Sequence, residues 1–436
     1  MADPADIAHL LRRTEFVARQ ARVTELEAGT IAAAVTNVMD FTANANPQIP
    51  ANLVTHDSAN SYGQFIAAHN WWLDSMATRP RPFQEKMTLF WHGHFVSEWE
   101  VVSRTDHMMS QNQLFRTSGL GNFLALTHAM ALQPAMLIYL SNGVNVKGTP
   151  NQNFARELLE LFTLGVGNYA EDDVAEAARA WTGHNYNTTT KAYEFRPTRH
   201  DTGDKTFFGI TRNWDGPETI NEILSVNTAK QLIAAKLIAK KLWEFLAYPK
   251  PAAYIVDELA ALFVLNNLEI RPLVEAILNR PEFYSAEAKQ GLVRTPAEWV
   301  VNLLARTGLT SAAINVQGYS EAMGQMVFNP PNVAGWKNNS YWMTTSALSG
   351  RANLAKRVAG LLRANGGFDG LYAMSVADSV DYVVNYFGLA PLAASSRTAL
   401  INAHQAELGA SNGSNSRAVT NLLIMTMLTG EMNVPS

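Results

Sequence analysis

The segment from Thr149 to Gly165 constrains the fold more than any other part of the sequence, because it predicts a helix that is mostly enclosed by protein. Thr149 and Gln152 fit a capping box, and Pro150 suits the first helical position. Gly165 suits the left-handed residue that closes a helix. At about 100° per residue, the apolar side chains of the segment cover an arc of roughly 220°. A surface helix needs an apolar stripe of only about 100°, so other helices must pack around this one.

The remaining arc of this helix is polar, and it gives the first candidate site. It carries the side chains of Asn153, Arg156, Glu157 and Glu160. Buried charges are costly unless they are paired or bind a metal. Glu157 and Glu160 are three residues apart, so both can reach one metal ion or one substrate. The alternative is structural, with an Arg156–Glu160 pair at i, i+4 and further salt bridges to neighbouring helices.

Composition excludes several classes of function. Of the 436 residues, 47% are hydrophobic and 17% are charged, against about 25% charged in a typical globular protein, which predicts a well-packed globule. The formal net charge of −4 gives no cationic field to attract nucleic acid, so we expect no nucleic-acid partner. The absence of cysteine excludes disulfides, thiolate zinc sites and a cysteine nucleophile.

Hydropathy and the N-terminal residues bear on location. No run of apolar residues is long enough for a transmembrane helix, so we expect no membrane span. The N-terminal residues lack the apolar core that follows the basic start of a signal peptide. We therefore expect a cytoplasmic protein, or an exported one if a leader has been removed.

Periodicity along the chain predicts the fold class. Most segments have helical spacing of apolar residues, whereas residues 183–215 are rich in Thr, Tyr, Phe and Asn and contain a turn at Thr202-Gly203. There is no strong internal repeat and no flexible linker. We predict a mainly α fold, a compact multi-helix globule forming a single domain over residues 1–436, with a small β-hairpin insertion near 183–215.

Two histidines in the sequence Trp91-His92-Gly93-His94 form the second candidate site. Neutral imidazoles suit zinc, iron, copper or nickel. We expect a helix to end at His92 and Gly93 to redirect the chain, since residues two apart on a continuous helix do not face the same way. The alternative is that His92 interacts with the helix dipole and His94 is hydrogen-bonded in the core.

Two loops supply further candidates. His200, Asp201 and Lys205 lie in the β-like insertion and can provide a metal ligand, a general base or an anion contact, or else form a polar hairpin turn. The segment from Asn329 to Trp336 contains two consecutive prolines and cannot be regular helix. It is either a rigid wall or lid of a cleft, or a structural loop locked by its prolines.

Several of these segments together resemble one family of proteins. The matching stretches include KMTLFWHGHFVS (86–97), NQNFARELLELFTLGVGNYAEDDVAEAARAWTG (151–183), HDTGDKTFFG (200–209) and GQMVFNPPNVAGW (324–336). They resemble the bacterial family catalogued as domain of unknown function eighteen-hundred, whose activity is not established. The resemblance implies an α-helical fold, frequent export, and a partner protein encoded nearby. His184 stands where the family usually has Trp, which adds an extra candidate ligand.

From these features we predict a metal-assisted enzyme, with a hydrolase favoured, acting on an unknown small molecule or polymer. The predicted ligands of one divalent metal ion are His92, His94, Glu157 and His200. Glu160 or Asp201 would be the general base, and Arg156 and Lys205 would stabilise developing negative charge. The predicted substrate contacts are Asn153, Asn332 and Trp336.

Two other classes of function stay open at this point. A non-catalytic binding or assembly protein would use the polar helix edge as a salt-bridge network and its aromatic loops as a docking surface. An iron or copper oxidoreductase would use the same His and Glu residues.

Overall fold

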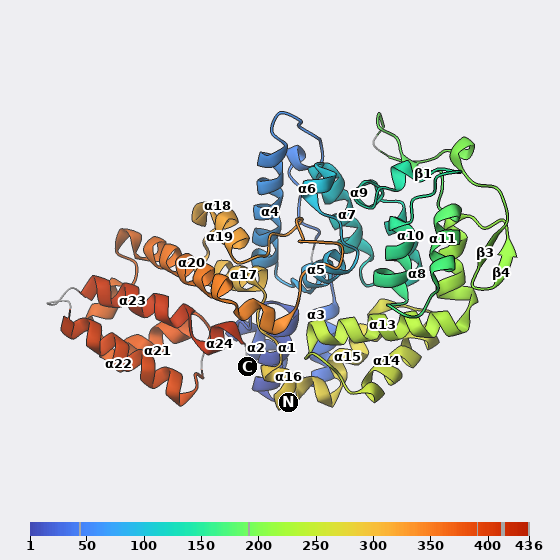
Figure 1. The fold of residues 1–436 in the computed structure, drawn as a ribbon. Coiled ribbons are helices and arrows are strands. Elements are labelled where there is room, and N and C mark those ends of the chain that lie inside the picture. Colours follow the sequence, from blue (N-terminus) through green and yellow to red (C-terminus); the bar gives the residue numbers. More distant parts are fainter. Residues whose placement is uncertain (43–44, 191, 390, 411–414, 435–436) are drawn as a thin grey trace.

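The computed structural model describes residues 1–42, 45–190, 192–389, 391–410 and 415–434. These residues form a mainly helical molecule, which confirms the predicted fold class. Figure 1 shows the C-terminal helices at one end of the molecule and the β-strands at the other. None of the described helices is both long enough and apolar enough to cross a membrane.

The helices follow one another with short connections. The first group is α1 (Pro4–Thr14), α2 (Gln20–Glu27), α3 (Ile31–Met39), α4 (Ser61–Thr78), α5 (Phe83–His94), α6 (Trp99–Val102), α7 (Thr105–Ser118), α8 (Phe123–Ala131) and α9 (Pro134–Tyr139). The second group is α10 (Asn153–Glu157), α11 (Glu171–Ala180), α12 (Gly216–Asn221), α13 (Thr228–Leu246), α14 (Ala253–Leu265), α15 (Ile270–Asn279) and α16 (Ala286–Gln290). The third group is α17 (Pro296–Thr307), α18 (Ser311–Ile314), α19 (Val316–Ala322), α20 (Thr345–Arg363), α21 (Val376–Tyr386), α22 (Ala394–Ala410), α23 (Asn415–Met427) and α24 (Gly430–Asn433).

The β-structure lies in the predicted insertion, as two separate two-stranded antiparallel hairpins. Strand β1 (His184–Tyr186) pairs with β2 (Tyr193–Phe195), so that His184 lies opposite Phe195. Strand β3 (Lys205–Phe207) pairs with β4 (Ile210–Arg212). The insertion near 183–215 is thus confirmed, with two hairpins in place of one.

The apolar side chains form two large clusters that meet at α5. One cluster contains the buried rings of Trp91, Trp181 and Trp243. The other contains Trp72 and Trp299 together with side chains of the C-terminal helices. Helix α5 contributes to both, because successive residues of a helix point in different directions. This helix is therefore enclosed on all sides.

Helix α5 continues through Gly93 to His94, so the predicted end of the helix at His92 is wrong. A glycine in a helix costs only about 1 kcal/mol relative to alanine. That cost is small compared with the free energy gained by burying the flanking Trp91 and Phe95, which are at most 1% exposed. Gly335 packs closely here, since a Cβ on it would lie 2.7 Å from the carbonyl oxygen of Gly93.

The helix predicted from Thr149 begins later, at Asn153, so the predicted capping box at Thr149 is wrong. The backbone N–H of Asn151 donates to the buried side chain of Asn145, and Asn151 in turn accepts from the N–H of Asn153. After Glu157 the chain forms a wider π-helical turn over Leu158–Thr163. Gly165 has φ +81°, as predicted for the residue that closes this helix.

Candidate metal centre

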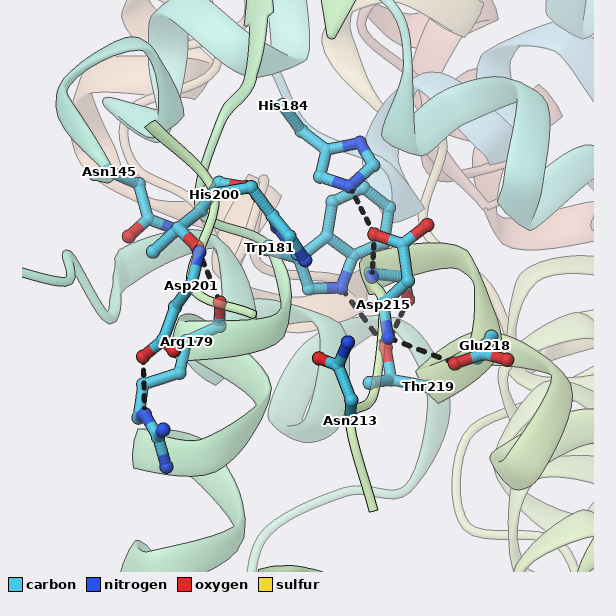
Figure 2. Close-up of polar contacts among 12 residues, drawn as sticks. Asn145, Arg179, Trp181, His184, His200, Asp201, Asn213, Asp215, Glu218 and Thr219 are labelled. Atoms are coloured by element: carbon cyan, nitrogen blue, oxygen red, sulfur yellow. Dashed lines mark hydrogen bonds and ion pairs between the residues drawn. The ribbon is translucent and has the colours of Figure 1, made fainter. Parts of the chain in front are cut away.

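Within the described residues, one group of His, Asp and Glu side chains places three metal-ligating atoms within 4.8 Å of one another: His184, His200 and Asp215. His184 begins β1, His200 follows the short helical turn Pro197–Arg199, and Asp215 is the residue before α12. Figure 2 shows the three side chains converging beside the ring of Trp181. Two imidazoles and one carboxylate therefore meet where the hairpins join the helical body.

The ring of His184 is held at both nitrogens. Its Nε2 lies 2.9 Å from Oδ1 of Asp215, and its Nδ1 lies 2.8 Å from the hydroxyl of Tyr193 on β2. Burial and the nearby carboxylate of Asp215 raise the pKa of Tyr193 to about 12, so this hydroxyl keeps its proton at neutral pH. A hydroxyl can donate or accept, so it suits either tautomer of His184.

Within the described part of the chain, His200 has a hydrogen-bond partner at one ring nitrogen only. Its Nδ1 lies 2.8 Å from the carbonyl oxygen of Thr182. A carbonyl can only accept, so Nδ1 donates and Nε2 keeps its lone pair. Metal-bound histidines almost always make such a bond with the nitrogen that does not bind the metal. His200 is therefore oriented in the way that a metal ligand requires.

Asp215 is both a candidate ligand and the N-cap of α12. Its Oδ1 accepts from the N–H of Gly216 at 2.8 Å, and its own N–H donates to Glu218, which completes a capping box. Burial raises the pKa of Asp215, but the hydrogen bonds from His184 and Gly216 outweigh it and leave the pKa below its usual value. The side chain is 46% exposed. The carboxylate of Asp215 is therefore ionised at neutral pH, and its exposed part makes the site accessible to solvent.

Two tight contacts fix the backbone around the histidines. Gly183 has φ +80°, and a Cβ there would lie 2.8 Å from the carbonyl oxygen of Arg196, so no other residue fits without displacement. A Cβ on Gly216 would lie 2.6 Å from the ring of Trp181. The indole of Trp181 also donates to Thr219 at 3.0 Å. β1 and α12 are therefore locked against each other through Trp181.

The arrangement is a set of two histidines and one carboxylate. Such a set holds catalytic zinc in some hydrolases, where a fourth position is left for water. The same set, with open positions, also holds non-haem iron in oxygenases. The described side chains can thus supply a three-ligand site for a divalent ion.

A profile of the family described as Protein of unknown function (DUF1800) matches residues 9–432. The chain belongs to this family. No curated protein and no solved structure matches it. The resemblance found in the sequence is therefore confirmed, and all three candidate ligands of this DUF1800 protein lie inside the matched region.

The structure does not gather the four predicted ligands around one point. His92 accepts from the N–H of Phe328 through Nε2, and burial lowers its pKa to about 3. His94 lies on another face of α5, with Nε2 3.1 Å from the carbonyl oxygen of Phe162 and Nδ1 3.2 Å from Nζ of Lys241. The reason is the unbroken helix, since residues two apart point in different directions. Of the four, only His200 lies in the three-ligand group.

The polar edge of the Asn153–Thr163 helix is partly exposed and separately paired. Arg156 binds both carboxylate oxygens of Glu171, at 2.8 and 2.7 Å, and does not form the expected pair with Glu160. Glu160 accepts from the hydroxyl of Tyr169. Burial, and the charge of Glu160, raise the pKa of Glu157. Asn153 is exposed at the start of the helix. The structural alternative named an Arg156–Glu160 pair, whereas the structure has a more exposed pair between Arg156 and Glu171.

Asp201 lies in the loop that follows His200, and Lys205 begins β3 at the end of that loop; both hold the loop backbone. Asp201 binds Nε of Arg179 at 2.8 Å, which lowers the pKa of its carboxyl. Lys205 is 1% exposed and donates to the carbonyl oxygens of Asp201 and Gly203 and to the side chain of Asn213. In Figure 2 the carboxylate of Asp201 points toward Arg179.

The loop with the two prolines borders a different space. Trp336, His94 and Lys241 line a cavity of about 190 Å³. Burial lowers the pKa of Lys241 to about 8. The side chain of Asn332 accepts from the N–H of Ala334 and so closes a turn. The structure thus brings His94 and Trp336 together, away from the three-ligand group.

Sequence reasoning missed Asp215 and the two residues that orient the rings, Thr182 and Tyr193. It named His200 as a ligand and His184 as an extra candidate. Asp215 had a local signal, because Asp215-Gly216-Pro217-Glu218 has the spacing of a capping box with proline in the first turn. That signal marks a helix start and does not reveal a metal ligand.

Proposed function

We propose that this DUF1800 protein binds a divalent metal ion through His184, His200 and Asp215 and uses the ion in a hydrolytic reaction. The observation that carries the proposal is the approach of three ligand atoms to within 4.8 Å of one another. The orientation of His200 by the carbonyl oxygen of Thr182 supports it.

The residues around the site suit a change from hydrogen bonding to metal binding. His184 now donates from Nε2 to Asp215, so metal binding requires its proton to move to Nδ1. Tyr193 allows this because its hydroxyl can accept from Nδ1 as readily as it donates to it. A bound divalent ion would lower the pKa of a water molecule and polarise a carbonyl or phosphoryl oxygen.

The charged groups next to the site, Asp201 and Lys205, hold its backbone in place and do not take part in the reaction. The pKa of Asp201 is lowered by Arg179, which makes its carboxylate a weak base. We therefore assign Asp201 and Lys205 to holding the His200 loop. Glu160 and Arg156, whose partners are Tyr169 and Glu171, have no part in this proposed site.

Metal titration tests the binding step. Protein stripped with a chelator is titrated calorimetrically with zinc, alongside the variants Asp215→Asn and His200→Gln. Asparagine caps a helix as well as aspartate does, so the first variant removes the charge and keeps the start of α12. His56→Gln, at an exposed histidine, is the matched control. We expect high-affinity uptake by the wild type and the control only. Equal uptake by wild type and Asp215→Asn would refute the site.

Turnover tests the second step. Ester, phosphoester and peptide substrates are assayed with the stripped and the zinc-loaded protein, and with zinc-loaded Asp215→Asn. Hydrolysis that requires both zinc and Asp215 supports the proposal. Zinc binding without hydrolysis of any class would leave a structural metal, which is the binding-protein alternative.

A second candidate function is iron-dependent oxidation, and the identity of the ligands favours it. Two histidines and a carboxylate are the ligand set of non-haem iron enzymes. The stripped protein is loaded with ferrous iron under nitrogen and then exposed to oxygen. Oxygen consumption that is lost in Asp215→Asn would favour this function, whereas oxygen uptake no faster than that of free iron would exclude it.

A further inference from the structure

A second cavity is lined by residues that are remote in sequence from the metal centre. Over the ranges that the structure describes, the arginines lining it have no anionic partner. It has a volume of about 650 Å³ and lies between α1, α17 and α24. Its charged lining residues are Arg12, Lys289, Arg294, Arg306 and Glu431. The volume falls within the range of about 300–1,000 Å³ that is usual for small-molecule sites.

Arg12 is the central observation. In the part of the chain that the structure describes, it makes no hydrogen bond and no ion pair, and its Nε is buried without a partner. A guanidinium carries five N–H donors and stays charged, and Arg12 is half-buried, so leaving its Nε without an acceptor is costly. A ligand that supplies oxygen acceptors would remove this cost.

Among the described residues, the neighbouring guanidiniums are bound to carbonyl oxygens and, for Arg294, also to the sulfur of Met432. Arg294 donates to the carbonyl oxygen of Met432 at 2.6 Å, and Arg306 donates to that of Ala18 at 2.6 Å. The Nε of Arg306 is also buried without a partner. Carbonyl oxygens satisfy a donor but carry no full charge, so these bonds do not neutralise the positive charge of either arginine.

The anions nearby do not neutralise this group. Asp6 forms a salt bridge with Lys289, with 2.6 Å between Oδ1 and Nζ. Glu298 is paired with Lys86 and does not line the cavity, although its charge acts on Arg294. Glu431 accepts from the N–H of Ala393 through one oxygen. Three guanidiniums therefore share this space with a single carboxylate.

Burial and mutual repulsion both disfavour the charged forms of these arginines. Burial, followed by the charges of Arg12 and Glu298, sets the pKa of Arg294, with a net fall to about 9. Burial and the charge of Arg306 lower the pKa of Arg12 to about 10. An anion placed among them would raise the pKa of both arginines.

A glycine makes room for Arg306. A Cβ on Gly388 would lie 2.1 Å from Nη2 of Arg306, and Gly388 has φ +64°. The backbone at this position therefore admits the guanidinium at close range, and a side chain there would displace it.

We propose that this cavity binds a tetrahedral dianion, as free phosphate or as the phosphate group of a small organic molecule, with Arg12, Arg294 and Arg306 as its ligands. Guanidinium forks match the oxygen spacing of phosphate and give strong charge-assisted bonds. Ala8, Ala18 and Val23 also line the cavity, so an organic body has apolar surface to lie against. This proposal is independent of the metal centre.

The test compares thermal unfolding in sodium phosphate, in glycerol 3-phosphate and in sodium chloride of equal ionic strength. We expect phosphate to raise the melting temperature of the wild type above its value in chloride. Tighter binding of the ester than of phosphate would identify a phosphorylated small molecule, and the reverse order would identify the free ion. A melting temperature equal to that in chloride with both would overturn the proposal.

The variant Arg12→Gln isolates the site. Arg12 makes no bond that the change would break, so this variant should fold, and in chloride it should melt no lower than the wild type because repulsion is relieved. Its phosphate affinity should fall about 10- to 100-fold, the value of one charge-assisted hydrogen bond. Arg417→Gln, at an arginine whose side chain is 62% exposed, is the control and should respond like the wild type. An undiminished phosphate response in Arg12→Gln would also overturn the proposal.

Discussion

Replacing Glu85 with glutamine should destabilise the protein more than any comparable change at the surface. Glu85 is 0% exposed and joins three elements. Its carboxylate accepts from Trp72 on α4 at 2.8 Å, from Arg79 at 2.6 Å, and from Nε and Nη2 of Arg116 on α7 at 2.7 and 2.8 Å. Glutamine has the same shape but leaves two guanidiniums side by side without their shared anion.

The magnitude follows from the burial of the partners. The side chains of Arg79 and Arg116 are 6% and 0% exposed, so water cannot replace the lost carboxylate. Removing one partner of a buried ion pair costs about 3–5 kcal/mol. A folded domain is stable by only about 5–15 kcal/mol, so we expect a large fall in both melting temperature and urea midpoint.

The matched control is Glu25→Gln. Glu25 pairs with Arg22 at 2.7 Å, but its side chain is 50% exposed, and exposed pairs contribute about 0–1 kcal/mol. Both variants are unfolded in urea and followed by far-UV circular dichroism. Equal midpoints for the two variants would show that burial of Glu85 does not set the cost, and the reasoning would fail.

The ion pairs of Glu85 with Arg79 and Arg116 also predict that the stability of the protein depends on pH. Burial raises the pKa of Glu85, but Arg116 and Arg79 outweigh it, so the folded pKa lies below the ordinary value of 4.5. A lowered carboxyl pKa gives stability that is complete above the unfolded value and is lost as the pH falls through the folded one. The difference between wild type and Glu85→Gln should therefore be constant near neutrality and shrink in acid.

Two further changes test the region around the metal centre, and a third tests the polar edge of the Asn153–Thr163 helix. Gly183→Ala should cost about 2 kcal/mol or more, because of its φ of +80° and the 2.8 Å approach to the carbonyl oxygen of Arg196; a calorimetric melting temperature equal to the wild type would contradict this. Lys205→Met should weaken zinc binding about 10- to 100-fold by releasing the loop after His200, and calorimetric titration would show it. Glu171→Gln should leave the urea midpoint unchanged within error, because its pair with Arg156 is exposed; a large fall would show that this pair has a role that the structure does not explain.

Much of the fold was predictable, because helical periodicity is a local property of the sequence. The mainly α class and the insertion near 183–215 followed from spacing and composition. The errors at Thr149 and Gly93 have a common origin, since both residues carry a local signal that distant contacts override. Asn145 draws the backbone away from a helix before Asn153, and burial of Trp91 and Phe95 carries α5 past Gly93.

The site was less predictable, because its three residues are brought together by the way the two hairpins fold back onto the helices. The side chains of His184 and Asp215 lie 2.9 Å apart, although His184 begins the first hairpin and Asp215 follows the second. Sequence spacing gives no measure of that path. His92, His94 and Glu160, which attracted attention in the sequence, have partners of their own in the fold.

The π-helical turn over Leu158–Thr163 has a consequence for comparing members of the family. The N–H of Leu164 donates to the carbonyl oxygen of Leu159, five residues back, so the turn holds one residue more than an α-helical turn would. The carbonyl oxygens of Leu161 and Phe162 meet the side chains of Lys241 and His94 there. A homologue with a regular α-helix here would carry a one-residue deletion inside this segment. An alignment that allows no gap within helices would then misalign the residues that follow the turn by one position.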